Sequence, residues 1–359
     1  MTTSPKDRPV ELLGLPRQRM AQALEGWIDR PFRVQQIYRA LHERGVTSFD
    51  EMTELSRDLR ERLTERFLLT TPEIATQAEA QDGTTKFLLR LHDGATIEMV
   101  DIPDGKRRTL CVSSQAGCAL ACRFCVTGFW GAGRNLSSGE ILSQILLARR
   151  LDPRDEGGLN LVFMGMGEPL LNLDNLRDAL EILFEQISWR RITVSTAGVI
   201  PGLEEMANWP RRPRLAISLH APDEARRDEI MPINRRYPLA DLLPVLAAWP
   251  LGPKERITFE YILIRDWNDA DEDADLLVKL LSGLRAKVNL IPLNPDPVLG
   301  DEMQPPTRGR VESFRRRLNE RGLLATVRKQ RGDDVSAACG QLRAPHREAR
   351  GFRRSNLSF

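Results

Sequence analysis

The sequence lacks any apolar run of the roughly 20 residues that a helix needs to cross a bilayer. Its first 15 residues are polar and contain no apolar core of a secretory signal. With 41% hydrophobic and 28% charged residues, the composition is typical of a globular protein. We therefore expect a cytoplasmic protein with no membrane partner, in a compartment that keeps thiols reduced.

Cysteine is also scarce, with five residues in 359. Clustered cysteines in a reducing compartment more often bind metal or take part in catalysis than form structural disulfides. Cys118, Cys122 and Cys125 have the spacing C-x3-C-x2-C, while Cys111 and Cys339 lie apart from them. Thiolate is the usual ligand of iron–sulfur clusters, and three thiolates can hold three irons and leave a fourth open.

A zinc site is the alternative interpretation of these three cysteines. Tetrahedral zinc normally needs a fourth cysteine or histidine. The chain has only four histidines, and none lies close to the cysteines in sequence. The pattern therefore favours an iron–sulfur cluster and leaves zinc as the less favoured possibility.

Charge is distributed unevenly along the chain. The whole sequence has a net charge of +2, but residues 308–359 contain 14 lysines and arginines against five aspartates and glutamates. Such a region favours an anionic partner, with nucleic acid the first candidate. A basic tail that only increases solubility explains the charge equally well.

The N-terminal part reads as helices followed by a hairpin. Residues 16–26, 32–44 and 55–67 carry apolar residues at helical spacing, and we assign residues 1–80 to a small helical domain. Residues 85–91 and 96–102 read as strands on either side of Asp93-Gly94, a strong hairpin pair. This hairpin forms an extension over residues 81–103.

From residue 104 onward, apolar strands alternate with amphipathic helices. Strands are expected at 109–113, 159–164, 192–195, 215–219, 257–264, 288–292 and 325–329, and helices at 138–150, 172–187, 200–209, 239–249, 271–284 and 308–321. Repeated βα units predict a parallel sheet with helices outside it, so we expect an α/β fold with a partial (βα)6 TIM-like barrel over residues 104–338. Residues 339–359 then form a separate segment with Cys339 and a basic tail. The cysteine cluster follows the first strand, which places it at the C-terminal rim where barrel active sites lie.

Several motifs resemble a known family. The C-x3-C-x2-C stretch, with Phe124 and Gly128, resembles the radical S-adenosylmethionine (SAM) superfamily, and Met164-Gly-Met-Gly-Glu-Pro169 resembles the glycine-rich strand end of that superfamily. Longer stretches at 110–118, 218–221, 291–295 and 331–342 occur in the order found in the RlmN/Cfr family of RNA methyltransferases. The resemblance covers nearly the whole chain, and Arg331-Gly-Asp-Asp334 is closer to the RlmN branch. Phe129-Trp130 departs from the family, which usually has a polar residue there.

The resemblance implies a radical SAM barrel with two cofactors. A [4Fe-4S] cluster would be held by Cys118, Cys122 and Cys125, and its open iron would bind SAM and yield a 5′-deoxyadenosyl radical. Carried over residue by residue, the SAM contacts fall on Gly167, Glu168, Ser195, Ser218, Leu219, His220 and Asn294. A reductase or flavodoxin-type electron donor is implied as a partner.

The resemblance also implies roles for the two remaining cysteines. Cys339 would accept a methyl group from one SAM, and the radical from a second SAM would take a hydrogen atom from that methyl group. The resulting methylene radical would add to carbon 2 of adenine, and Cys111 would attack the Cys339 sulfur to release the product as a disulfide forms. Glu98 would remove the proton from the adduct, although it also fits as an exposed hairpin residue.

The implied substrates are 23S rRNA, at an adenine of the peptidyl transferase centre, and tRNA, at the adenine 3′ of the anticodon. The helical domain of residues 1–80 and the basic tail would bind the RNA backbone, and we expect a monomer. Two alternatives remain: methylation of adenine at carbon 8, as in Cfr, and a zinc-stabilised RNA-binding protein without catalysis.

Overall fold

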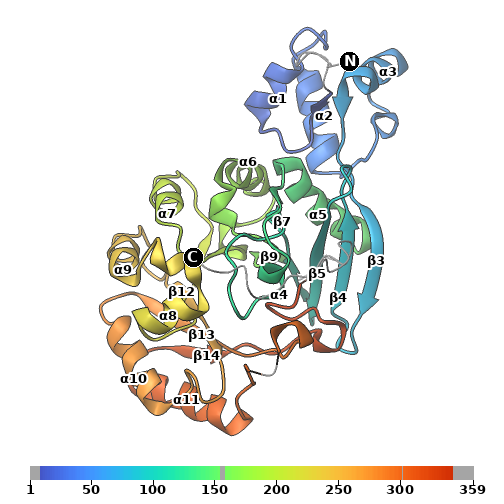
Figure 1. The fold of residues 1–359 in the computed structure, drawn as a ribbon. Coiled ribbons are helices and arrows are strands. Elements are labelled where there is room, and N and C mark those ends of the chain that lie inside the picture. The colour runs from blue at the N-terminus through green and yellow to red at the C-terminus, as the bar shows by residue number, and fades with distance from the viewer. Residues whose placement is uncertain (1–8, 154–157, 301, 343–359) are drawn as a thin grey trace.

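The computed structural model describes residues 9–153, 158–300 and 302–342. Its centre is a mixed sheet in the order β14-β13-β12-β11-β10-β9-β6-β5-β4-β3 (Figure 1). Its strands are β3 (Glu73–Glu79), β4 (Thr85–Arg90), β5 (Thr96–Asp104), β6 (Arg107–Cys111), β9 (Leu159–Phe163), β10 (Ile192–Thr196), β11 (Arg214–Ser218), β12 (Ile257–Leu263), β13 (Ala286–Pro292) and β14 (Ala325–Val327). The sheet stays open because its edge strands, β14 and β3, do not pair with each other.

The strands from β6 to β14 run parallel and are joined by helices that lie along the outer side of the curved sheet (Figure 1). The helices are α5 (Ser138–Leu151), α6 (Leu173–Leu183), α7 (Ile200–Ala207), α8 (Glu224–Ile230), α9 (Leu239–Ala247), α10 (Asp271–Leu280) and α11 (Arg308–Glu320). The predicted partial barrel is confirmed, and each helix and strand expected between residues 138 and 329 is present. The short polar helix α8 was not predicted.

The core lies between the sheet and these helices. Alternate residues of the parallel strands face the helices and are fully or almost fully buried: Leu161, Val194, Ile217, Phe259 and Val288. Their neighbours on the strands point to the concave face of the sheet, because side chains alternate along a strand. The concave face is therefore free to carry polar groups.

Strands β3, β4 and β5 extend the sheet in antiparallel fashion beyond β6. The predicted hairpin is present, and Gly94 at its turn has φ of +82°. Strand β3 was missed: it lies within the range assigned to the helical domain, yet it pairs with β4 in the large sheet. Its sequence EIATQAE is polar because an edge strand here is only partly buried, so it lacks the apolar alternation that marks a strand.

The N-terminal part forms a helical unit beyond one end of the sheet (Figure 1). Its elements are β1 (Val10–Glu11), α1 (Arg17–Ala23), α2 (Phe32–His42), η2 (Phe49–Glu51), α3 (Arg57–Arg66) and β2 (Phe67–Leu68). The three predicted helices are confirmed, and the parallel pair β1–β2 closes the unit. The predicted basic tail, residues 343–359, lies outside the described residues. No helix in the described ranges is long and apolar enough to cross a membrane.

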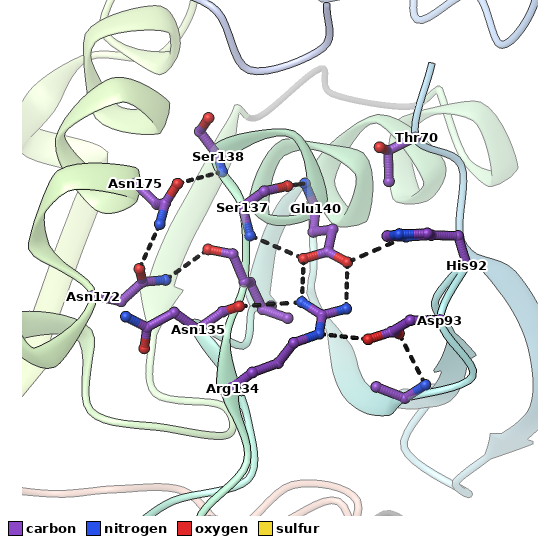
Figure 2. A network of polar contacts seen from close by, with 12 residues as sticks. Thr70, His92, Asp93, Arg134, Asn135, Ser137, Ser138, Glu140, Asn172 and Asn175 are labelled. Atoms are coloured by element: carbon purple, nitrogen blue, oxygen red, sulfur yellow. Dashed lines mark hydrogen bonds and ion pairs between the residues drawn. The ribbon is translucent and has the colours of Figure 1, made fainter. Parts of the chain in front are cut away.

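The cysteine loop is closed at its base by a small hairpin of β7 (Gln115–Ala116) and β8 (Arg134–Asn135), and it contains α4 (Val126–Phe129). Figure 2 shows that Arg134 points to Glu140 in the first turn of α5 and to Asp93 at the hairpin turn. Both guanidinium–carboxylate bonds to Glu140 are 2.7 Å long, and Arg134 lies 2.6 Å from Asp93. The base of the loop is thus fixed to both the barrel and the hairpin extension.

The remaining helical turns are short 3-10 segments that lie in loops. They are η3 (Pro169–Leu171), η4 (Trp189–Arg191), η5 (Pro232–Arg235), η6 (Pro297–Leu299) and η7 (Asp333–Val335). The first of these directly follows the glycine-rich stretch, and the last precedes Cys339. These two turns set the chain direction next to the site.

Candidate active site

One cavity at the C-terminal ends of the parallel strands brings together most of the predicted site. It is lined by all three clustered cysteines and by five of the seven predicted SAM contacts: Gly167, Glu168, Ser195, Ser218 and His220. These residues come from four separate segments of the chain, which the barrel topology gathers at one rim. Their shared cavity is observed, and their binding roles remain predictions.

The glycine-rich turn after β9 needs glycine for space and for backbone conformation. Gly167 has φ of +99°, and a Cβ there would lie 2.5 Å from the Cβ of Gln115. Side-chain oxygens of the buried Glu168 accept hydrogen bonds from the amides of Leu170 (3.0 Å) and Ala197 (2.8 Å). Burial raises the pKa of Glu168, while these amides oppose that rise. Glu168 therefore ties the end of β9 to the end of β10.

His220 adopts a left-handed backbone conformation, with φ of +58°. Its Nδ1 accepts a hydrogen bond of 3.1 Å from the amide of Ile262, and its ring centre lies 4.4 Å from that of Phe124. Burial, with a smaller effect from Arg227, lowers the pKa of His220 to about 3, so the ring is neutral. The predicted contact Leu219 is fully buried and is not among the residues lining the cavity; its amide donates to the Glu260 carbonyl.

The three clustered cysteines suit an iron–sulfur cluster in donor chemistry and in placement. All three line one cavity, so a cluster bound there could reach each of them. Gly128 keeps the loop compact, because a Cβ there would lie 3.2 Å from the Cys122 nitrogen. Within the described ranges, no group of three or more histidine, cysteine or acidic side chains could hold a metal ion as it stands.

A second cavity contains the two remaining cysteines. Cys111 and Cys339 both line it, and Cys339 also lines the cavity of the clustered cysteines. Cys111 is thus the last residue of β6, and Cys339 lies beside both the cysteine loop and Cys111. Burial, followed by the nearby Cys339, raises the pKa of Cys111 to about 12.

Hydrogen bonds to main-chain carbonyls hold the Cys339 segment against the cysteine loop. The Val126 amide donates to the Gly340 carbonyl (2.6 Å), and the Thr127 hydroxyl donates to the Leu342 carbonyl (2.7 Å). Asn294, predicted as a SAM contact, lines the second cavity and donates from Nδ2 to the Cys339 carbonyl at 3.2 Å. Its observed contact positions Cys339.

Arg328 was missed by sequence reasoning. It follows β14, lines both cavities, and lies 3.5 Å from the Met164 sulfur. The neighbouring Cys339 raises the pKa of Arg328 most, burial lowers it, and Glu260 and Cys111 raise it further. Arg328 comes two residues after Thr326, which faces the concave side of the sheet. Side-chain alternation along the predicted strand is therefore the one sequence signal that could have placed Arg328 on that side.

Glu98 is a buried residue of β5, which overturns its interpretation as an exposed hairpin residue. The strand register pairs Lys86 with Val100 and Val100 with Cys111, so these three side chains share one face of the sheet. Glu98 lies two residues before Val100 on the same strand, so its side chain is on that face too. Lys86, also missed by sequence reasoning, places its ammonium nitrogen 3.4 Å from Glu98 Oε1 and 3.1 Å from the Ser336 carbonyl. Glu98 is not among the residues lining the two cavities above.

Two family models match the chain. Residues 112–278 match the radical SAM superfamily, and residues 10–69 match the "Ribosomal RNA large subunit methyltransferase N-terminal domain". The first match covers the parallel barrel from the end of β6 into α10, and the second covers the N-terminal helical unit.

Relatives of known name match almost the entire chain. The dual-specificity RNA methyltransferase RlmN of Anaeromyxobacter dehalogenans is 48% identical, covering 94% of this chain and 93% of its own. The enzyme of the same name from Marinobacter nauticus is 43% identical, covering 93% and 92%. A crystal structure of a radical SAM methyltransferase from Sphaerobacter thermophilus superposes with a TM-score of 0.88 at 40% identity, covering 94% of this chain and 100% of that one.

We expect Thr127→Val to loosen the Cys339 segment. The substitution keeps the side-chain shape but removes the bond to the Leu342 carbonyl, which contributes about 1 kcal/mol. Alkylation of Cys339 by iodoacetamide, followed by peptide mass spectrometry, should become about fivefold faster, because 1 kcal/mol corresponds to that factor. Thr64→Val removes a hydroxyl that bonds within α3 and is the control; equal rates in both variants and the wild type would contradict the role of Thr127.

Proposed function

Because the chain belongs to the RlmN family of radical SAM RNA methyltransferases, we propose that it methylates carbon 2 of adenine in 23S rRNA and in tRNA. In this proposal Cys339 carries the methyl group. The observation that supports it is the position of Cys339 in the walls of two cavities, one shared with the clustered cysteines and one with Cys111. A carrier must reach both the source of the radical and the thiol that later displaces it.

Cys118, Cys122 and Cys125 would hold a [4Fe-4S] cluster, and the polar rim at Gly167, Ser195 and Ser218 would contact SAM beside it. When bound, this pair of cofactors supplies a reductively generated carbon radical. The cavity walls around it include Leu120, Phe163 and Met231, whose apolar side chains exclude water from a reactive species.

Cys339 begins the reaction as a nucleophile. Its thiol loses a proton, and the sulfur attacks the methyl group of SAM, so that an S–CH3 bond forms as the sulfonium bond breaks. Arg328 faces this sulfur from the wall of both cavities, and a fixed cation stabilises the thiolate that performs the attack. The product is a neutral thioether, which suits a half-buried position.

Cys111 completes the reaction after the methyl carbon of Cys339 is bonded to the base. The adduct would first give up its unpaired electron, for which the bound cluster would be the acceptor. The Cys111 thiolate then attacks the Cys339 sulfur, an S–S bond forms, and the S–C bond breaks; its electron pair stays with the CH2 carbon on adenine, which takes up a proton to become the methyl group. Glu98 accepts the proton that leaves carbon 2. The disulfide must then be reduced by cellular thiols before another turnover.

Lys86 prepares Glu98 for this proton transfer. A carboxyl group as buried as that of Glu98 is hard to ionise alone, and a cation at 3.4 Å favours its charged form. Because Lys86 also donates to the Ser336 carbonyl, it connects the proposed base to the segment that ends at Cys339. Lys86 thereby positions Glu98, the proposed general base, relative to the segment that carries Cys339.

The product nucleoside tests the proposed reaction. The protein is reconstituted anaerobically with iron and sulfide, reduced, and incubated with SAM and either a 23S rRNA fragment or a tRNA transcript. Hydrolysed RNA should contain 2-methyladenosine by mass spectrometry against standards. Finding only 8-methyladenosine would assign Cfr-type chemistry, and a colourless protein with stoichiometric zinc and no product would contradict methyltransfer altogether.

The two cysteines should fail in different ways when replaced. Cys339→Ala removes the carrier, so methylated product should fall to background. Cys111→Ala leaves the carrier but removes the thiol that displaces it, so protein should remain covalently attached to RNA and migrate as a slower band on denaturing gels. Normal turnover by either variant would remove that cysteine from the mechanism.

Replacing Lys86 should slow the release of the methylated adenine from Cys339. With Lys86→Met we expect product formation to drop about 100-fold, the scale of general base catalysis, and the protein–RNA adduct to accumulate. The acidic limb of the pH–rate profile should move to higher pH, because the buried carboxylate loses its cation. Lys86→Arg, which keeps the charge, should restore both; a Met variant with unchanged profile and no adduct would show that Lys86 is only structural.

A further inference from the structure

A basic hollow lies at the end of the barrel opposite the active site, where β11, β12 and β13 begin. Its walls carry six cationic side chains and one acidic one: Arg211, Arg212, Arg214, Lys254, Arg256 and Lys287, with Glu255. Parallel strands that start here end at the cysteine cavity, so the two sites are separated by the length of the strands. None of the chemistry proposed above uses this hollow.

Some of these cations have structural partners. Arg212 donates to the Trp209 carbonyl at 2.7 Å, and Arg211 donates to the Phe184 carbonyl at 3.1 Å. Both carbonyls follow the last turn of a helix, where cations are favourable because the helix dipole ends in negative charge. Arg256 likewise donates to the Ala286 carbonyl at 3.4 Å.

Arg214, Lys254 and Lys287 differ, since within the described ranges no acidic side chain lies within ion-pair distance of them. The strand register pairs Lys287 with Thr258 and Thr258 with Ala216, and Arg214 lies two residues before Ala216. Arg214 and Lys287 therefore share the concave face of the sheet. Burial and the charge of Arg214 lower the pKa of Lys287, and the charge of Glu260 opposes this with a smaller effect, so Arg214 and Lys287 lie close enough to repel each other.

We propose that this basic hollow binds the phosphate backbone of the substrate RNA, outside the stretch that enters the active site. This inference rests on the proposed function, because it takes RNA as the substrate. Six cations exceed what one phosphate needs, which favours a chain of phosphates over a small anion. Trp189 at the wall, with the Arg190 guanidinium 4.5 Å from its ring centre, adds an aromatic surface of the kind on which bases stack.

An acidic electron-donor protein fits this place less well. Its electrons must reach the clustered cysteines, and those lie at the other end of the strands. RNA has no such restriction, because phosphates along a folded RNA can contact a protein far from the modified base. Arginine also matches phosphate geometry with two parallel N–H groups, and four of the six cations are arginines.

The test neutralises Arg214, Lys254 and Lys287, the cations of the hollow that have no acidic partner among the described residues and no hydrogen bond named above. In the full-length enzyme, Arg214→Gln, Lys254→Gln and Lys287→Gln are combined, and the Kd for a tRNA transcript is measured from 50 to 300 mM KCl. Each lost phosphate contact lowers the magnitude of the slope of log Kd against log salt by about 0.7–0.9, so a decrease of about two is expected. Methylation of a short stem-loop, which cannot reach the hollow, should be unchanged.

A matched control removes three exposed cations from the outer helices: Arg177→Gln, Lys279→Gln and Arg316→Gln. A triple hollow variant with the same salt slope as this control would overturn the proposal, whether or not the enzyme methylates RNA. If the triple variant does not fold, the exposed Lys254→Gln alone should still lower the slope by about one. Failure of the proposed function would appear separately, as absence of methylated stem-loop with the wild-type protein.

Discussion

The contact between the Cys339 segment and the cysteine loop depends on main-chain carbonyls. The carbonyls of Cys339, Gly340 and Leu342 each accept one hydrogen bond, from Asn294, the Val126 amide and Thr127. Such bonds specify the path of the backbone and leave the Cys339 thiol free to face the cavities. Gly340 makes the close approach feasible, because with φ of +82° any Cβ would lie 2.9 Å from the Phe124 carbonyl oxygen.

That contact works only because the cysteine loop is itself anchored. Gln115, at the base of the loop, accepts from the Glu168 amide at 2.8 Å and donates to Asn135 at 2.7 Å. Asn172 donates to the carbonyls of Ser114 and Leu136, both at 2.8 Å. The glycine-rich turn, the loop and α5 are thus one hydrogen-bonded unit, continuous with the ion pairs in Figure 2. A displacement of any member would move the three clustered cysteines relative to the rim.

The barrel and the segments that carry the cysteines follow from local sequence patterns and could be predicted. Apolar strands and amphipathic helices marked the barrel, and cysteine spacing with flanking motifs marked the cluster loop, Cys111 and Cys339. Elements without an apolar pattern escaped prediction, such as the edge strand β3 and the helix α8, whose sequence EARRDEI is almost entirely polar. Lys86 and Arg328 escaped for another reason: their importance arises from strand register, which brings residues far apart in sequence onto one concave face.

Carrying residues over from a family pattern placed five of the seven predicted SAM-contact residues in one cavity, and the contacts themselves stay predictions. Leu219 and Asn294 occupy motif positions, yet one is buried behind the cavity wall and the other binds the backbone of Cys339. A sequence motif identifies the segment that forms a site. The direction of each side chain in that segment, such as those of Leu219 and Asn294, depends on the turn that follows the strand.

The cysteine loop precedes the Cys339 segment along the chain, and this order has a consequence for biosynthesis. The cysteine loop and the strands up to β12 leave the ribosome long before the segment that docks on them, and chains fold as they emerge. During that interval the loop is uncovered, so iron, sulfide and their delivery proteins can approach it from the side that Cys339 later occupies. Docking of the last segment then acts as a final step of maturation, in which Cys339, the proposed methyl carrier, arrives only after the loop that is proposed to hold the cluster is built.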